Sequence, residues 1–376
     1  GDAAVGPHSA SVLREMIARG QVSPTDLVRK EGVQEWRPAL SAEGLLLPPA
    51  SPAPDSSDVN VSVVAPPLPS ELPRGEQRFE RHVPQRVARF EVRQRLGSGS
   101  FGNVYRAYDP VLERELAIKV ATSEALGNER ARPLVLQEPK AAAKLRHPNI
   151  VAVHDAGFDG PLFYIAIDLI HGCTLRERLQ QGPMTPGDAV RLVMSLAEAL
   201  EYAHRSQVLH RDVKPSNIMI DADSQALLMD FGLAKIEHST GEQTQAEKGF
   251  LGTPGYMPPE QINREWGEVG PHSDQYSLGV VLYELLCGHP PFAGPESVLV
   301  ANTLHVVPLA LSDHGATIDR DLEAICMKTL AKKPGDRYAS CQAFADDLRR
   351  YQEGWPTLAR PLRLSERVMR WSRRER

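Results

Sequence analysis

The pattern of apolar and polar residues divides most of the chain into a strand-rich stretch followed by a helix-rich stretch. From Phe90 onward, apolar and polar residues alternate around a glycine cluster and again over 115–120, which predicts paired strands. Later segments place apolar residues at helical spacing, notably over 189–204 and 277–287, and these predict helices. Strands first and helices later is the order of an α+β fold.

Changes in composition along the chain predict four parts. Residues 1–47 mix apolar and charged positions like a small folded module, and 48–89 form a linker with eight prolines between 48 and 73. Proline lacks an amide donor, so this stretch is either a semi-extended linker or a ligand for a proline-recognising domain. Residues 90–351 form the main domain. Residues 352–376 form a basic tail that contains seven arginines.

The net charge and the cysteine positions indicate which partners and which cellular compartment to expect. A formal net charge of -5 gives no basis for binding a polyanion, so we expect no nucleic-acid partner. The four cysteines form no C-x-x-C pair, which favours core thiols in a reducing, cytoplasmic compartment. No apolar run reaches the ~18–20 residues of a membrane-spanning helix. Position 1 is Gly, so we expect a processed form or a fragment of a longer protein.

A glycine-rich segment and a strand lysine predict a phosphate-binding site. The segment 96–104 contains the pattern G-x-G-x-x-G-x-V, and glycines without a Cβ let backbone amides approach phosphates closely. A flexible turn or a dinucleotide-binding motif would be alternatives, but the latter should open a helix, and a strand-like segment, 104–107, follows here. Lys119 then lies inside an apolar strand, at a distance from the glycines that suits a phosphate-binding lysine.

Two further motifs follow along the chain. Residues 210–217 read His-Arg-Asp-Val-Lys-Pro-Ser-Asn, and 230–232 read Asp-Phe-Gly. Together with the glycine segment and Lys119, they resemble the serine/threonine protein kinase family over about 260 residues, from Phe90 to roughly Tyr351. The resemblance implies a bilobal fold with a small β-rich lobe and a larger helical lobe. It also implies transfer of the γ-phosphoryl group of ATP to Ser and Thr hydroxyls of protein substrates.

The same resemblance assigns chemical roles. Asp212 would be the catalytic base, Lys214 would steady the transferring phosphoryl group, and Asn217 and Asp230 would hold Mg²⁺, with Mn²⁺ as an alternative. Thr253 would shape the acceptor pocket. The residues that would contact ATP are Gly97, Ser98, Gly99, Ser100, Phe101, Gly102, Val104, Ala117, Lys119, Asp168, Ile170 and Met219, with Ile167 as gatekeeper.

Further positions also resemble the kinase family, and one position departs from it. Arg337 resembles the buried ion-pair partner of Glu260, and Asp274 resembles the aspartate that anchors the catalytic-loop backbone. Glu138 is best placed to pair with Lys119, but Pro139 follows it directly. Because proline is tolerated only in the first turn of a helix, either that helix begins late or it is bent at the ion pair.

The two ends of the chain carry weaker resemblances. Residues 6–40 are similar to a bacterial module related to the GYF family, which implies either a binder of proline-rich peptides or a structural appendage. Residues 359–374, with Trp371 among arginines, resemble the segment before a membrane span in kinases of planctomycete-type bacteria. A solvated basic tail is the alternative reading of the second segment.

The motifs leave three functional readings of unequal weight. An active kinase is favoured because every residue needed for transfer is present, whereas a pseudokinase scaffold would have lost one of them. A peptide adaptor rests only on the first forty residues. If the kinase is active, we expect autophosphorylation in signalling at Ser239, Thr240 or, foremost, Thr244, because a phosphate there would pair with Arg211.

Overall fold

The structure is a computed structural model that describes residues 84–99, 102–122, 135–231, 254–314 and 318–360, and the backbone of 27–28 and 37–38. The chain divides into two units, Gly1–Leu72 and Pro73–Arg376. In the first unit β1 (Leu27–Val28) pairs antiparallel with β2 (Arg37–Pro38). The remainder of the predicted module, most of the predicted linker and the end of the basic tail lie outside the described residues.

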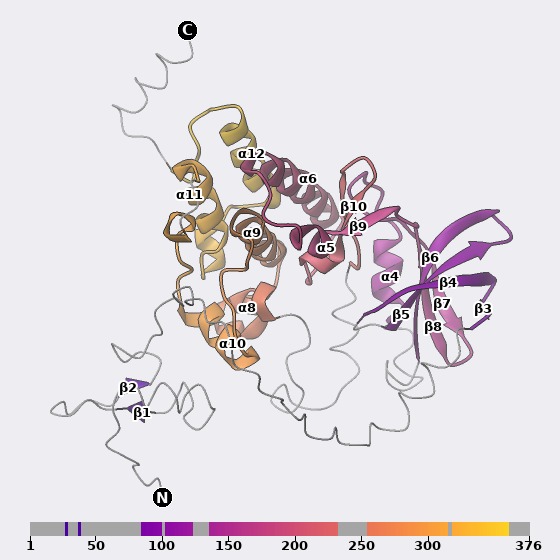
Figure 1. The fold of residues 1–376 in the computed structure, drawn as a ribbon. Coiled ribbons are helices and arrows are strands. Elements are labelled where there is room, and N and C mark those ends of the chain that lie inside the picture. The colour runs from indigo at the N-terminus through magenta and orange to yellow at the C-terminus, as the bar shows by residue number, and fades with distance from the viewer. Residues whose placement is uncertain are drawn as a thin grey trace, which may run out of the picture. The chain divides into compact units, whose positions relative to one another are not determined.

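In the second unit the chain first forms a six-stranded antiparallel sheet, at the right of Figure 1. Its strands are β3 (Arg86–Val87), β4 (Phe90–Gly99), β5 (Gly102–Asp109), β6 (Arg114–Thr122), β7 (Val153–Asp159) and β8 (Leu162–Ile167). Their spatial order is β3-β4-β5-β6-β8-β7. One helix, α4 (Gln137–Ala142), lies beside the sheet on the side of the helical lobe (Figure 1).

Alternation along the strands gives the sheet two apolar faces. Tyr105 and Ile118 are buried on one face, in a cluster that closes the outer side of the sheet. Ala117, Ile165 and Ile167 are buried on the other face, and partly buried side chains such as Val104 pack against them. Successive side chains of a strand point to opposite faces, so the alternation predicted from the sequence explains the first cluster, whereas the second cluster is built from the positions in between.

The helical lobe follows the sheet in the chain. Its helices are α5 (Leu175–Leu179), α6 (Pro186–Arg205), α8 (Pro259–Ile262), α9 (Pro271–Cys287), α10 (Glu296–His305), α11 (Arg320–Thr329) and α12 (Cys341–Gln352). A small sheet of β9 (Gly172–Thr174), β10 (Ile218–Asp221) and β11 (Ala226–Leu228) adjoins them. The predicted helices 189–204 and 277–287 fall inside α6 and α9, and the predicted bilobal α+β fold is confirmed. None of the helices in the described ranges is both long enough and apolar enough to cross a bilayer.

Described residues on both sides of 90–351 also pack against this unit. Before Phe90, β3 pairs with β4 and the side chain of Val87 is fully buried, so the last residues of the predicted linker belong to the sheet. After Tyr351, the amides of Leu358 and Ala359 donate to the buried carboxylate of Asp347, at 2.6 and 2.9 Å. The first part of the tail is therefore held on the helical lobe.

Candidate active site

The glycine segment forms the hairpin between β4 and β5. Gly99 pairs with Gly102 across this hairpin, whereas Ser100 and Phe101 at its tip lie outside the described residues. Gly102 has a φ of +126°, and a Cβ at this position would meet the Val120 carbonyl oxygen at 2.2 Å. Only glycine fits there, so the hairpin can lie close against β6 and leave its open side to a ligand.

A cleft with a volume of about 750 Å³ opens between the sheet and the helical lobe. The predicted nucleotide and metal residues that line it are Gly97, Ser98, Gly102, Val104, Ala117, Lys119, Asp168, Ile170, Asn217, Met219 and Asp230, with Lys214 beside them. Val104 and Ala117 come from the sheet, whereas Met219 comes from β10 of the other lobe. An apolar slot between two lobes suits a flat heterocycle, and the glycine hairpin lies at one end of it.

The catalytic-loop residues are tied to one another by short polar contacts. Nζ of Lys214 lies 2.8 Å from Oδ2 of Asp212. The side-chain amide of Asn217 donates to the same oxygen at 2.8 Å and to the Asp212 carbonyl at 2.9 Å. Within the described residues both side-chain contacts fall on Oδ2, so Oδ1 of Asp212 remains available to a substrate.

A buried carboxylate holds the backbone before Asp212. Asp274 on α9 accepts from the amide of His210 at 2.9 Å and from that of Arg211 at 2.7 Å, and Arg211 has a φ of +66°. Burial alone would raise the pKa of Asp274, but the hydrogen bond from His204 and the nearby histidines lower it below its ordinary value. The anchoring role predicted for Asp274 is confirmed. His204 was missed, although its position six residues before the loop histidine offers a spacing signal.

Lys119 contacts the carboxylate of Asp230, although the two residues are 111 positions apart in the chain. The lysine lies on the inner face of β6 and is almost fully buried, so its charge is directed into the cleft. Asp230 has a φ of +70°, which turns the chain sharply between Met229 and Phe231. The predicted phosphate-binding cation and the predicted metal ligand therefore meet at one point of the cleft.

The predicted partner of Glu138 is wrong for this structure. Oε1 of Glu138 lies 3.7 Å from Nη1 of Arg211, whereas the ion pair of Lys119 in the described residues is with Asp230. α4 starts at Gln137, which puts Pro139 in its first turn, but Val135 just before it is helical as well, and the residues that precede Val135 lie outside the described ranges, so the choice between a late start and a bend stays open. Glu138 lies in this first turn, where its side chain reaches Arg211.

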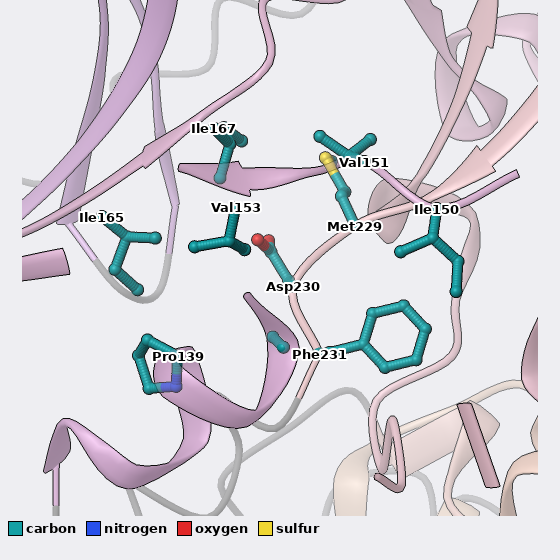
Figure 2. A pocket seen from close by; sticks show the side chains of 10 residues that line it. Pro139, Ile150, Val151, Val153, Ile165, Ile167, Met229, Asp230 and Phe231 are labelled. Carbon is teal, nitrogen blue, oxygen red and sulfur yellow. The ribbon is translucent and has the colours of Figure 1, made fainter. Parts of the chain in front are cut away.

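Pro139 has a packing role that the sequence did not indicate. Figure 2 shows its ring facing Ile165 and Val153 across a small cavity of about 20 Å³, with Phe231 closing the other side. The ring of Phe231 lies 4.6 Å from that of His210, centroid to centroid. The start of α4 is thereby packed against the same segment that carries Asp230 (Figure 2).

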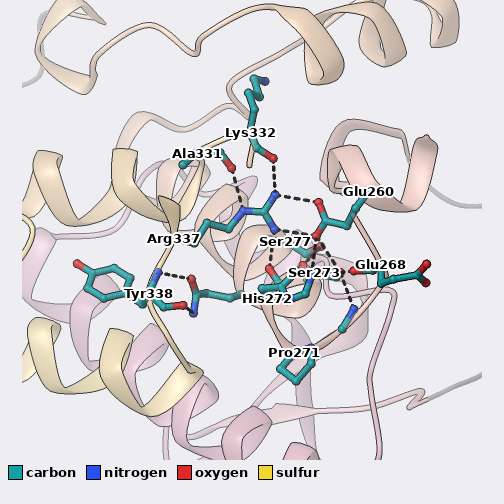
Figure 3. A network of polar contacts seen from close by, with 12 residues as sticks. Glu260, Glu268, Pro271, His272, Ser273, Ser277, Ala331, Lys332, Arg337 and Tyr338 are labelled. Atoms are coloured by element: carbon teal, nitrogen blue, oxygen red, sulfur yellow. Dashed lines mark hydrogen bonds and ion pairs between the residues drawn. The ribbon is translucent and has the colours of Figure 1, made fainter. Parts of the chain in front are cut away.

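The predicted ion pair between Glu260 and Arg337 is confirmed, and both side chains are fully buried. Nη1 and Nη2 of Arg337 donate to the two carboxylate oxygens at 2.7 and 2.9 Å. The guanidinium also donates to the carbonyls of His272, Ala331 and Lys332, as Figure 3 shows. This network fastens α8, which follows the predicted activation segment, to the core of the helical lobe. Thr253 and the three predicted phosphorylation sites lie outside the described residues.

Comparison with known proteins agrees with this geometry. The family model described as "Protein kinase domain" matches residues 90–348, and that of "GYF domain 2" matches residues 1–45. The chain is 38% identical over 274 residues to "Serine/threonine-protein kinase PknB" of Mycobacterium tuberculosis, covering 71% of this chain and 44% of the relative. It is 33% identical to "Serine/threonine-protein kinase PrkC" of Bacillus subtilis, covering 69% and 40%. The chain thus spans less than half the length of these curated relatives.

Solved structures show the same fold. The crystal structure of the Mycobacterium tuberculosis PknI kinase domain superposes with a TM-score of 0.56 at 29% identity. The match covers 70% of this chain and 96% of that domain. The two family models also confirm the resemblance to protein kinases and to a GYF-related module that the sequence predicted.

Proposed function

The chain belongs to the protein kinase family, and from this premise we propose that it transfers the γ-phosphoryl group of ATP to Ser and Thr hydroxyls of protein substrates. One observation carries the proposal: the predicted base is in contact with the predicted supporting lysine and with the side chain of the predicted metal ligand. Asp212, Lys214 and Asn217 form this group, at separations of 2.8 Å. A fold kept only for binding would have no need to maintain this arrangement.

The contacts on Asp212 explain how it would act as a base. Lys214 and Asn217 both contact Oδ2 of Asp212, and these two contacts orient the carboxylate. Its Oδ1 is left to accept the proton of a substrate hydroxyl. The ammonium of Lys214 is close enough to offset negative charge that develops on the oxygens of the phosphoryl group. Because transfer needs little covalent help, positioning and charge are what these residues supply.

The residues beside the base fit a divalent cation. The amide nitrogen of Asn217 is turned to Asp212, which leaves its Oδ1 for a metal, and Asp230 adds a carboxylate oxygen. In the described ranges no cluster of three His, Cys, Asp or Glu side chains could hold a metal. Two protein oxygens suit Mg²⁺ or Mn²⁺, which fills its other positions with phosphate and water. When bound, the ion would offset charge on the phosphates of ATP.

The direct test is phosphate transfer by the purified chain from labelled ATP, with the modified residues mapped by mass spectrometry. Asp212→Asn should bind ATP almost as the wild type does but lose several orders of magnitude of kcat, because the base acts only in the transition state. Wild-type turnover in this variant would refute the assignment. Tight ATP binding without any transfer by the wild type would favour the scaffold reading.

We also propose that autophosphorylation regulates the enzyme through Arg211. Its guanidinium is held only loosely, 3.7 Å from Glu138, and a phosphate with about two negative charges would compete for it. Thr244 is the expected site, with Ser239 and Thr240 as alternatives. Mass spectrometry of fully active protein that shows none of the three modified would contradict this proposal.

For the ends of the chain we propose a peptide contact and a cytoplasmic, membrane-proximal location. The match to a GYF domain supports binding of proline-rich peptides by residues 1–45. Use of ATP and four free cysteines support the cytoplasm, and the arginines with Trp371 support a position beside a bilayer. A proline-rich peptide array and flotation with anionic vesicles test the two proposals, and no binding in either assay would refute the corresponding one.

A further inference from the structure

The cleft continues past the apolar slot to a polar rim. On β5, the side chains of Val104 and Arg106 lie on the same face, and Arg106 is farther from the glycine hairpin. A strand rises ~3.3 Å per residue, so Arg106 lies about 7 Å beyond Val104 on the side away from the hairpin. Arg106 lines the cleft, as do Gln94 on β4 and His171 after the segment that joins the lobes.

The register of the sheet places the rim residues together. Arg106 pairs with Gln94 on one side and with Ala117 on the other, and residues directly opposite each other share a face. The rim therefore adjoins the face that covers the slot. Arg95 pairs with Tyr105, one position away in register, and so points to the opposite face of the same sheet.

The guanidinium of Arg106 has unused donors. Nη2 lies 2.5 Å from Oε2 of Glu115, and this contact raises the pKa of Arg106 and lowers that of Glu115. Its Nε is shielded from solvent and has no acceptor among the described residues. Both side chains of the ion pair are more than a third exposed, so Glu115 can yield the guanidinium to another anion at little cost.

We propose that Gln94, Arg106 and His171 form a rim subsite for an anionic group carried by a purine-type ligand on the side of the base away from the phosphates. The proposal rests on the proposed function, since it places the base between Val104 and Met219. A carboxylate matches the fork of a guanidinium and gains a charge-assisted hydrogen bond that a neutral group lacks. Three polar side chains at the mouth of the cleft thus select the chemistry of the extension, not of the base.

The probes are two matched pairs of anilinopurines, linked at position 2 or position 6, in which the para substituent is a carboxylate or a carboxamide. Calorimetry at low salt gives the affinity ratio within each pair. We expect the carboxylate to bind about fivefold more tightly in the favourable pair, the range of a partly exposed ion pair. Arg106→Leu should bring the ratio to about one, Arg95→Leu should keep it, and Glu115→Gln should increase it by freeing the guanidinium.

The affinity ratio of carboxylate to carboxamide distinguishes binding at the rim subsite from a general change in the cleft. A variant that perturbs the fold lowers both affinities of a pair and leaves their ratio unchanged. Ratios near one in both wild-type pairs, or a preference that survives Arg106→Leu, would overturn the subsite while leaving the nucleotide cleft in place. Failure of all four compounds and of ATP to bind would instead overturn the proposed function, and the rim with it.

Discussion

Replacing Arg337 by alanine should destabilise the helical lobe strongly. The side chains of Arg337 and Glu260 are both fully buried, and the guanidinium also satisfies three backbone carbonyls. After the substitution the Glu260 carboxylate keeps the hydroxyl of Ser273, at 2.8 Å, and a distant contact with Nε2 of His272, at 3.9 Å. Breaking a buried pair by removing one partner costs about 3–5 kcal/mol, so we expect a loss of about 4 kcal/mol.

The assay is urea unfolding followed by tryptophan fluorescence, with the free energy of unfolding obtained by linear extrapolation. A matched control is Arg349→Ala, because Arg349 also contacts two carboxylates, Glu198 and Asp346, but its side chain is 39% exposed. Exposed pairs contribute about 0–1 kcal/mol, so the control should lose no more than that. A loss below about 1 kcal/mol for Arg337→Ala, or one equal to the control, would refute the argument from burial.

The pair can also be removed as a unit. The double variant Glu260→Gln, Arg337→Met replaces both charges, so neither is left buried without a partner. It should therefore be less destabilised than the sum of the two single variants, by a coupling that a double-mutant cycle measures. Additive losses would mean that each side chain acts through its own packing, not through the ion pair.

Three further predictions concern the edges, the pH dependence and the thiols. Deleting residues 84–89 should lower the melting temperature, because the fully buried Val87 leaves the sheet; an unchanged value would contradict this. Burial lowers the pKa of Lys332 to about 8, so above that pH the unfolded chain binds more protons than the folded chain. The free energy of unfolding should therefore rise from about pH 8 to 10, and this rise should be absent in Lys332→Met. Iodoacetamide should modify Cys173, which lines the cleft, before Cys287, whose pKa burial raises to about 11, and ATP should slow the first reaction.

Much of the fold and the chemistry of the site could be predicted because both depend on patterns with few alternatives. A strand that alternates apolar and polar residues has one buried face, and the β4–β5 hairpin followed from that pattern and the glycines. Asp212, Asn217 and Asp230 could be predicted because their motifs stand in the order and at the spacing of the family that the chain resembles, and phosphoryl transfer needs a base and oxygen ligands of these types. The pair of Glu260 and Arg337 was predictable from resemblance, since burial leaves each charge only one suitable partner.

The edges of the domain could not be predicted because their order comes from single distant contacts. Val87 follows a proline-rich stretch, and nothing local shows that a strand of two residues will pair with β4. Leu358 and Ala359 have no periodic pattern, and their amides are held by Asp347, more than ten residues earlier. Such contacts require a buried carboxylate whose oxygens can accept further hydrogen bonds, and its position is set by the folded helical lobe. The pattern of residues along the chain does not show where that carboxylate will lie.

The partner of Glu138 shows the limit most clearly. Lys119 pairs with Asp230, and Arg211 pairs with Glu138. At ~1–4 kcal/mol per pair, the residue types alone do not decide which cation meets which carboxylate. Pro139 follows Glu138 in the first turn of α4, and its ring lines the small cavity beside Phe231. Residue types therefore indicate which charges gather at the site, whereas the packing of the folded chain determines which of them meet.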